Sequence, residues 1–203
     1  MNIDGRPWRT IGPEPDGCSV WVIDQTALPY SFGTKTLSSC QEAADAISTM
    51  VVRGAPLIGV TGAYGLVLAL QADPSDAALA DAHAVLLATR PTAVNLQWAL
   101  DRVRDLVMVL PPEQRAEAAR QEAARIADED VAMCEAIGEH GLRLFQQLAA
   151  ARPAERQNEP FQVLTHCNAG WLATVDWGTA LAPIYKAHRA GLNIHVWVDD
   201  TRP

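Results

Sequence analysis

The chain has 203 residues, of which 49% are hydrophobic and 20% charged, and its formal net charge is −8. This is the composition of an ordinary globular protein with enough apolar material for one large or two modest domains. The acidic balance, without a basic stripe, argues against a nucleic-acid partner. An anionic small substrate needs a local arginine pocket in such a chain.

A small sheet and then a helix are expected at the start of the chain. Apolar and polar residues alternate between residues 7 and 36, and a turn sequence lies at 13–17, which predicts an antiparallel hairpin or meander. Residues 38–50 read as a helix with Ser38 or Ser39 as its cap.

An apolar helical pattern follows at residues 56–70 and contains several small residues, which indicates close packing against neighbours. The uncharged stretch 54–73 is near membrane-spanning length, but it is too rich in glycine to commit to lipid. We therefore interpret it as a buried helix and expect no membrane partner. Further helices are expected at 75–88, 92–109, 112–133 and 135–150.

A polar segment bounded by prolines at 151–160 is interpreted as a domain junction. Beyond it we expect a strand at 161–165, a helix at about 174–189 and a strand at 193–198. These elements make one β-α-β unit.

The predicted fold class is α/β. Residues 1–152 are expected to form a mostly helical N-terminal domain with a small β-meander. Residues 153–203 are expected to begin a Rossmann-like domain that remains incomplete, because two strands leave a sheet edge unpaired.

Two segments combine an arginine with the start of a helix. Arg53 precedes Gly54, Ala55 and a proline, and Arg90 precedes Pro91 in a similar way. A guanidinium, free amide N–H groups and the positive end of a helix dipole together suit a phosphate. A surface arginine at an ordinary helix start is the alternative for each segment, but two such starts in an acidic chain favour a shared anion site.

Cys167 follows the first expected strand of the β-α-β unit, where open α/β sheets place ligands. An inert cysteine is the alternative. His166 would point the opposite way on an extended chain, so we do not pair the two residues. Other candidate acids are Asp199 and Asp200, whereas Asp176 is expected to help start a helix. Trp171, Trp177 and Trp197 read as core or pocket wall.

The remaining cysteine pattern argues against a metal or redox motif, because the spacings are wide and no C-x-x-C occurs. The N-terminus shows no signal sequence, so a reducing, cytoplasmic location is expected. The cysteines are Cys18, Cys40, Cys134 and Cys167.

Several segments, taken in their order and spacing, resemble the methylthioribose-1-phosphate isomerases, the aldose–ketose isomerases of methionine salvage. The resemblance extends from about Asn2 to the last residue. The segments that carry it are 50–59, 89–96, 164–170, 178–180 and 198–203.

The resemblance implies conversion of 5-methylthioribose 1-phosphate to 5-methylthioribulose 1-phosphate, an intramolecular oxidoreduction without metal or other cofactor, in a homodimer. Arg53, Gly54, Ala55 and Arg90 match the substrate-contacting positions of this family. Cys167 matches its active-site cysteine.

The same fold also serves non-catalytic regulatory subunits of a translation-initiation nucleotide-exchange factor and ribose-1,5-bisphosphate isomerases, which remain alternatives. Asp200 stands where the family commonly has glutamate. The glutamine and the catalytic aspartate of the family match nothing before Pro203. We therefore expect these 203 residues to be the N-terminal part of a longer protein and to be inactive alone.

Overall fold

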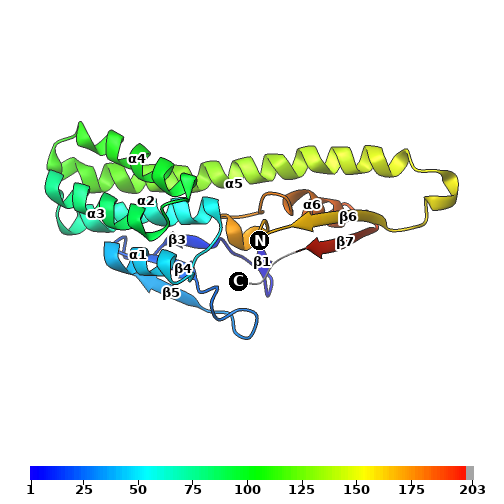
Figure 1. The fold of residues 1–203 in the computed structure, drawn as a ribbon, viewed down its shortest axis with the longest axis horizontal. Helices are drawn as coiled ribbons and strands as arrows, with labels where there is room; N and C mark the ends of the chain where they lie inside the picture. Colours follow the sequence, from blue (N-terminus) through cyan, green and yellow to red (C-terminus); the bar gives the residue numbers. More distant parts are fainter. Residues whose placement is uncertain (200–203) are drawn as a thin grey trace.

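The computed structural model describes residues 1–199, and it has two parts joined by one long helix (Figure 1). A bundle of helices with a small antiparallel sheet lies at one end, and a β-α-β unit lies alongside the far half of the long helix. The mixed α/β class is therefore confirmed. Asp200 lies outside the described residues, as does the rest of the matching segment to Pro203.

Three antiparallel strands form the small sheet in the order β3-β4-β5, as the expected meander requires. In the turn between the first two strands, the Asp16 carboxylate accepts hydrogen bonds from the amides of Cys18 and Ser19 at 2.8 and 3.1 Å. A separate hairpin of two short strands precedes the sheet. The bounds are β1 Asn2–Ile3, β2 Arg6–Pro7, β3 Ile11–Pro13, β4 Val20–Ile23 and β5 Thr34–Leu37.

Helix α1 (Cys40–Ser48) begins where the Ser39 hydroxyl accepts a hydrogen bond from the Glu42 amide at 3.2 Å, so Ser39 is the cap. Helix α2 (Ala55–Ala72) is apolar and buried over most of its length. By length and composition α2 could cross a membrane, but 72% of it is buried inside the protein. The expectation of a buried helix is confirmed.

Small residues let α2 approach helix α4 (Val94–Met108) closely. A Cβ atom on Gly59 would lie 2.8 Å from the Asn95 carbonyl oxygen, and one on Gly62 would lie 2.4 Å from Leu96 Cδ1. From Gly59 to Gly62 on α2, the nearest residue on α4 moves from Asn95 to Leu96, so the two helices run in the same direction. The N-termini of α2 and α4 therefore lie at the same end of the bundle, which is the end facing the β-α-β unit (Figure 1).

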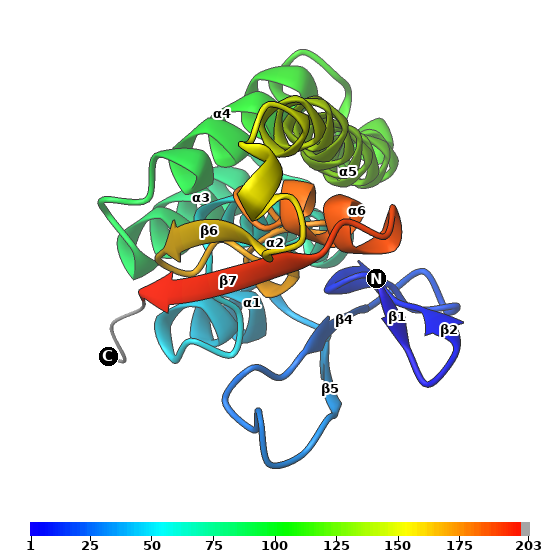
Figure 2. The ribbon, with the colours of Figure 1, turned by 90° about the vertical axis from the view of Figure 1, so that its right-hand side faces the viewer.

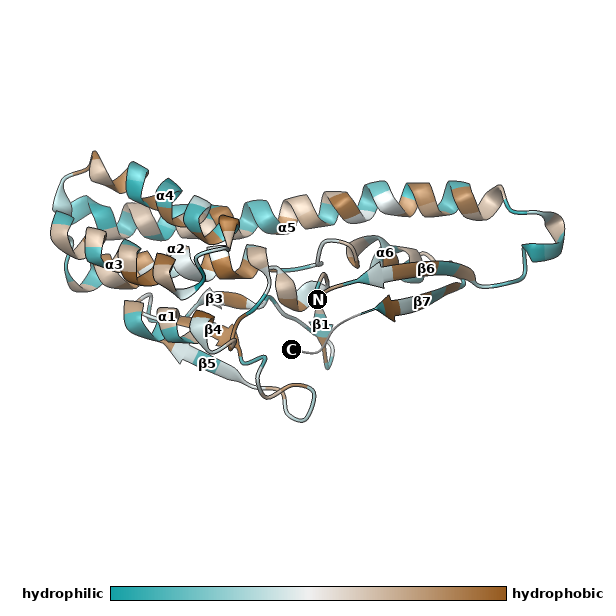
Figure 3. Ribbon diagram, viewed as in Figure 1, coloured by the Kyte–Doolittle hydropathy of each residue, from teal (hydrophilic) through white to brown (hydrophobic). Residues whose placement is uncertain are grey.

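Helix α3 (Asp76–Thr89) is capped by Ser75 and leads back to this end. Helix α5 (Pro112–Ala150) then runs for 39 residues without a break. The expectation of two helices at 112–133 and 135–150 is wrong, because no proline or glycine interrupts the hydrogen-bond ladder between 131 and 137. Hydrophobic and hydrophilic turns alternate along α5 (Figure 3).

The β-α-β unit contains the two expected strands, β6 (Phe161–His166) and β7 (Ile194–Asp199), which pair in parallel. A short 3-10 turn, η1 (Ala154–Arg156), comes before them. Helix α6 (Ala182–Arg189) lies between β7 and α5 in the view along α5 (Figure 2).

The expected helix at 174–189 is wrong in its first half. A 3-10 turn, η2 (Trp171–Ala173), is followed by irregular chain up to α6. Trp177 and Gly178 have φ values of 70° and 78°, which a right-handed helix does not permit. Asp176 starts no helix, because its carboxylate binds the Met1 amino group at 2.5 Å and the Trp177 amide.

Candidate functional site

The segment Arg53–Gly54–Ala55 forms the N-terminus of α2. Gly54 is the N-cap, with φ 102° and ψ 131°, and no side chain caps this helix. The amides of the first turn are therefore oriented to the helix start, where the dipole is positive and an anion is favoured.

Gly54 packs directly against the turn that follows Cys167. A Cβ atom at this position would lie 2.3 Å from Ala173 Cα and 2.5 Å from the Ala173 oxygen. The positive φ and this close approach both exclude a larger residue. The arginine loop of the helical bundle and the chain after β6 are thus in contact, although 119 positions separate Gly54 from Ala173.

Arg90 ends α3 and lies in the turn that leads to α4. The helix begins at Val94 and not at Pro91, and the Ala93 amide donates to the Arg90 carbonyl at 2.9 Å. The side-by-side run of α2 and α4 places this turn at the same end of the bundle as Gly54. The two arginine segments therefore share one end of the bundle, as expected for a common anion site.

Cys167 lies directly beyond the carboxyl end of β6. Its side chain is exposed, its φ is 71°, and its amide donates to the Asp199 carbonyl at 3.1 Å. A left-handed conformation at a residue other than glycine is uncommon and is often found at functional sites. The carboxyl ends of β6 and β7 point toward the helical bundle (Figure 1).

His166 precedes Cys167, and its Nδ1 lies 3.2 Å from Asp199 Oδ2. This pair joins the ends of the two parallel strands, and both side chains are exposed. Tyr185 lies on the other side of the turn, with its hydroxyl near Gly170. Burial raises the pKa of Tyr185 above its ordinary value, so this hydroxyl is a neutral hydrogen-bonding group.

Five buried side-chain nitrogen or oxygen atoms find no hydrogen-bond partner among residues 1–199. Each such atom carries a free-energy penalty of about 1–3 kcal/mol, so native proteins contain few of them. The five atoms are Gln25 Oε1, Arg53 Nε, Arg90 Nη1, Thr165 Oγ1 and Trp171 Nε1. Arg53 and Trp171 flank the Gly54–Ala173 contact, Arg90 lies in the turn at the same end of the bundle, and Thr165 is on β6 shortly before Cys167.

Residues next to the strands of the small sheet hydrogen-bond to the chain before Arg53 and to the chain after Cys167, and so hold these two segments together. The Gln25 amide donates to the Val51 carbonyl at 3.0 Å, and its side-chain Nε2 donates to the Leu172 carbonyl at 2.7 Å. Thr10 donates through its hydroxyl to the Thr174 carbonyl at 2.5 Å. We call the contact between residues 25, 51–55 and 171–174, together with the Arg90 turn and the end of β6, the junction site.

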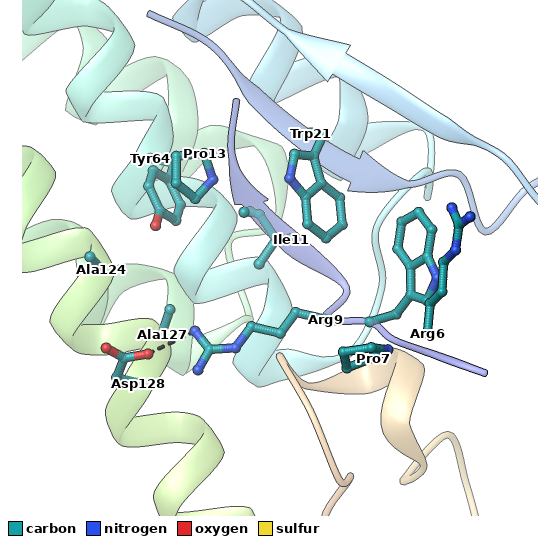
Figure 4. A pocket seen from close by; sticks show the side chains of 12 residues that line it. Arg6, Pro7, Arg9, Ile11, Pro13, Trp21, Tyr64, Ala124, Ala127 and Asp128 are labelled. Carbon is teal, nitrogen blue, oxygen red and sulfur yellow. Dashed lines mark hydrogen bonds and ion pairs between the residues drawn. The ribbon is translucent and has the colours of Figure 1, made fainter. Parts of the chain in front are cut away.

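A hollow of about 640 Å³ lies between β3, β4 and α5, and none of Arg53, Arg90 and Cys167 lines it (Figure 4). Its main charged groups satisfy each other, because Arg9 Nη1 binds Asp128 Oδ1 at 2.7 Å. We favour the junction site over this hollow, since unpaired buried donors are available to a ligand whereas the members of an ion pair already have partners.

Within the described residues, no group of three or more His, Cys, Asp and Glu side chains is placed to hold a metal ion. The absence of a metal and of other cofactors from the reaction remains a prediction.

Sequence reasoning missed two residues of the junction site, Gln25 and Trp171. Gln25 follows an apolar strand in an ordinary turn sequence, and Trp171 reads as core or pocket wall. Their unpaired polar atoms become visible only once the fold has buried them.

A family profile described as the Initiation factor 2 subunit family matches residues 51–203. Among curated relatives, a methylthioribose-1-phosphate isomerase of Methylobacterium nodulans is 64% identical over 203 residues, covering all of this chain and 54% of that protein. One of Rhodospirillum rubrum is 58% identical and is covered to 52%. The chain spans about half the length of the curated relatives it matches.

Two solved structures are also similar. Subunit delta of the translation initiation factor eIF-2B from A. fulgidus has a TM-score of 0.77 and 35% identity, over 95% of this chain and 54% of that one. The 5-methylthioribose 1-phosphate isomerase from Pyrococcus horikoshii has a TM-score of 0.75 and 36% identity, over 95% and 52%.

Proposed function

The chain belongs to the initiation factor 2 subunit family, and from this premise we propose that its complete protein interconverts 5-methylthioribose 1-phosphate and 5-methylthioribulose 1-phosphate. The observation that carries the proposal is the pair of buried, unpaired guanidinium nitrogens on Arg53 and Arg90 at one end of the bundle. A phosphate is an acceptor-only group that suits both of them. The names of the relatives supply the sugar.

In this proposal Arg53, Arg90 and the amides of Gly54 and Ala55 bind the phosphate. The phosphate on the anomeric oxygen prevents ordinary ring opening, so the site must help the ring oxygen to leave. The bond between C1 and the ring oxygen breaks, and the ring oxygen takes a proton. Hydrogen moves from C2 to C1, and the C2 hydroxyl becomes a carbonyl by releasing its own proton, which replaces the one given to the ring oxygen. Cys167 donates the proton to the ring oxygen or stabilises the developing charge.

The proposal extends to the organisation of the protein. Residues 1–152 form the N-terminal domain and residues 153–203 begin a Rossmann-like domain in a cytoplasmic homodimer. The 203 residues alone are inactive, because the further acid–base residue of the family lies outside them.

A second candidate is a non-catalytic regulatory subunit, which the likeness to the A. fulgidus initiation factor favours. The two candidates share the fold, so the fold does not separate them. A purely regulatory role gives no reason for buried, unpaired nitrogens on two arginines at one end of the bundle.

The test is an assay of the protein translated from the complete reading frame, with the aldose phosphate as substrate and ketose formation as the readout. Arg53→Ala and Arg90→Ala should each weaken substrate binding roughly 10- to 150-fold, because a hydrogen bond to a charged group contributes about 1.5–3 kcal/mol. Arg143→Ala, at an exposed arginine of α5, is the matched control. If the wild type formed no ketose, the isomerase proposal would be rejected and the regulatory subunit would remain.

A further inference from the structure

We propose that Gln25 and Trp171 recognise the sugar hydroxyls of the substrate, while the arginines recognise its phosphate. The inference rests on the proposed function and assigns the specificity of that same site.

Gln25 is held at the junction site by two bonds of different kinds. Its backbone amide donates to Val51, two residues before Arg53, and its side-chain Nε2 donates to the Leu172 carbonyl at 2.7 Å. The side chain is 5% exposed, and its Oε1 finds no donor in the described chain. Turning the amide over would place an oxygen against the Leu172 carbonyl, so the acceptor end is the end left free.

Trp171 is the residue directly before the carbonyl that Gln25 binds. Its indole Nε1–H is buried and has no acceptor within residues 1–199. Indole offers only a donor, and the free end of the Gln25 amide offers only an acceptor. A lone acceptor and a lone donor therefore border the same short turn.

A hydroxyl group both donates and accepts, so it can serve these two atoms, and neighbouring ring hydroxyls can serve them separately. A phosphate dianion only accepts and leaves Gln25 Oε1 unsatisfied. The donors of Arg53 and Arg90 fit the phosphate instead. Four of the five unpaired atoms thus divide into a donor-only group and a mixed group, which matches the two chemical parts of a sugar phosphate; the fifth, Thr165 Oγ1, both donates and accepts and so fits either part.

The experiment uses the protein of the complete reading frame with two variants, Trp171→Phe and Gln25→Met. Trp171→Phe removes the N–H and keeps an aromatic ring. Gln25→Met keeps the length of the side chain and the backbone bond to Val51. Gln71→Met is the matched control, because the Gln71 side chain also donates to a backbone carbonyl, that of Gly17 at 2.9 Å, but is exposed on α2.

Calorimetry measures the affinity of each protein for 5-methylthioribose 1-phosphate and for inorganic phosphate. The two variants should bind the sugar phosphate roughly 5- to 30-fold more weakly, which corresponds to about 1–2 kcal/mol, and bind inorganic phosphate as the wild type does. The control should match the wild type with both ligands.

Equal weakening for both ligands would show a general distortion of the site and overturn the inference, and so would unchanged sugar-phosphate affinity. If Gln25→Met does not fold, Trp171→Phe decides alone. A wild type that neither binds nor isomerises the sugar phosphate refutes the proposed function itself. A wild type that isomerises it while the variants behave normally refutes only the role of Gln25 and Trp171.

Discussion

The four thiols of the chain differ in accessibility in a way that isolates Cys167. Cys167 and Cys18 are exposed, whereas burial raises the pKa of Cys40 and raises that of Cys134 to about 12. Because the thiolate is the reactive form, iodoacetamide should label Cys167 and Cys18, Cys40 slowly and Cys134 hardly at all.

Substrate should protect only one of these two exposed thiols in the complete protein. At ten times the dissociation constant, the sugar phosphate should slow labelling of Cys167 about tenfold by mass action and leave Cys18 unchanged. Mass spectrometry of tryptic peptides measures both rates in one sample. Equal protection of both thiols, or of neither, would count against a substrate site beside Cys167.

Burial and hydrogen bonding shift the pKa of Asp130 on α5 in opposite directions. Burial raises its pKa, while a hydrogen bond from the buried Val175 amide at 2.7 Å acts in the opposite sense. The folded protein therefore holds this proton to higher pH than the unfolded chain does. The contribution of Asp130 to stability is largest below its unfolded pKa and declines as pH rises through the folded pKa.

Asp130→Asn keeps an acceptor for Val175 and removes this titration. Its stability relative to the wild type should rise as pH increases above about 4, the usual pKa of an aspartate, and level off once the folded carboxyl has ionised. Asp130→Ala should be about 1–3 kcal/mol less stable than Asp130→Asn at every pH, because the Val175 N–H is left unpaired. Urea unfolding at a series of pH values measures both differences. A flat difference curve for Asp130→Asn would refute the raised pKa.

At the scale of elements, two glycines of α5 allow α6 to dock. A Cβ atom on Gly141 would lie 2.3 Å from Cγ of the rigid Pro183 ring, whereas one on Gly138 would lie 3.0 Å from the flexible Lys186 side chain. Alanine in a helix interior normally stabilises by about 1 kcal/mol relative to glycine.

Gly141→Ala should nevertheless destabilise the protein by about 1–3 kcal/mol through overpacking, while Gly138→Ala should change stability by less than about 1 kcal/mol. Chemical unfolding of both variants gives the comparison. A stabilised Gly141→Ala protein would show that α6 does not sit on this glycine as described.

Local patterns predicted most elements but not their junctions. Ser39, the alternation in β3 to β5 and the apolar run of α2 each act within one turn or strand, and the structure confirms them. The loop at 174–181 depends on partners far away in the sequence, because Asp176 binds Met1 and the Val175 amide donates to Asp130. No local pattern reports such contacts.

The same limit applies to the candidate site. Arg53, Gly54 and Arg90 carry signals of their own, since charge, glycine and helix starts are visible along the chain. Gln25 and Trp171 carry none, because their significance comes from polar atoms that folding leaves buried and unpaired.

At the scale of the whole molecule, the outer face of the β6–β7 pair is uncovered in the described chain. Leu164 and Trp197 lie opposite each other and are 71% and 58% exposed. Parallel sheets normally bury both faces. The 203-residue polypeptide should therefore self-associate at micromolar concentration, which light scattering coupled to gel filtration measures.

Replacing both residues by lysine should shift the polypeptide toward monomer. Val109→Lys is the control, since Val109 is 82% exposed at the end of α4 and lies far from the sheet. A wild-type polypeptide that stays monomeric, or a control that also dissociates, would contradict this assignment.

Helix α5 also determines how the two parts of the protein are rotated relative to each other about the helix axis. Its first half packs on α2 and α4 and its second half on α6, so one continuous helix of 39 residues, about 58 Å long, fixes their relative rotation. One residue inserted near position 132 would turn everything downstream by about 100°. Seven inserted residues would restore the angle to within about 20° but displace the cysteine-bearing part by about 10 Å. Exposed residues of α5 can therefore be substituted freely, whereas insertions or deletions in this helix move the two parts of the protein relative to each other.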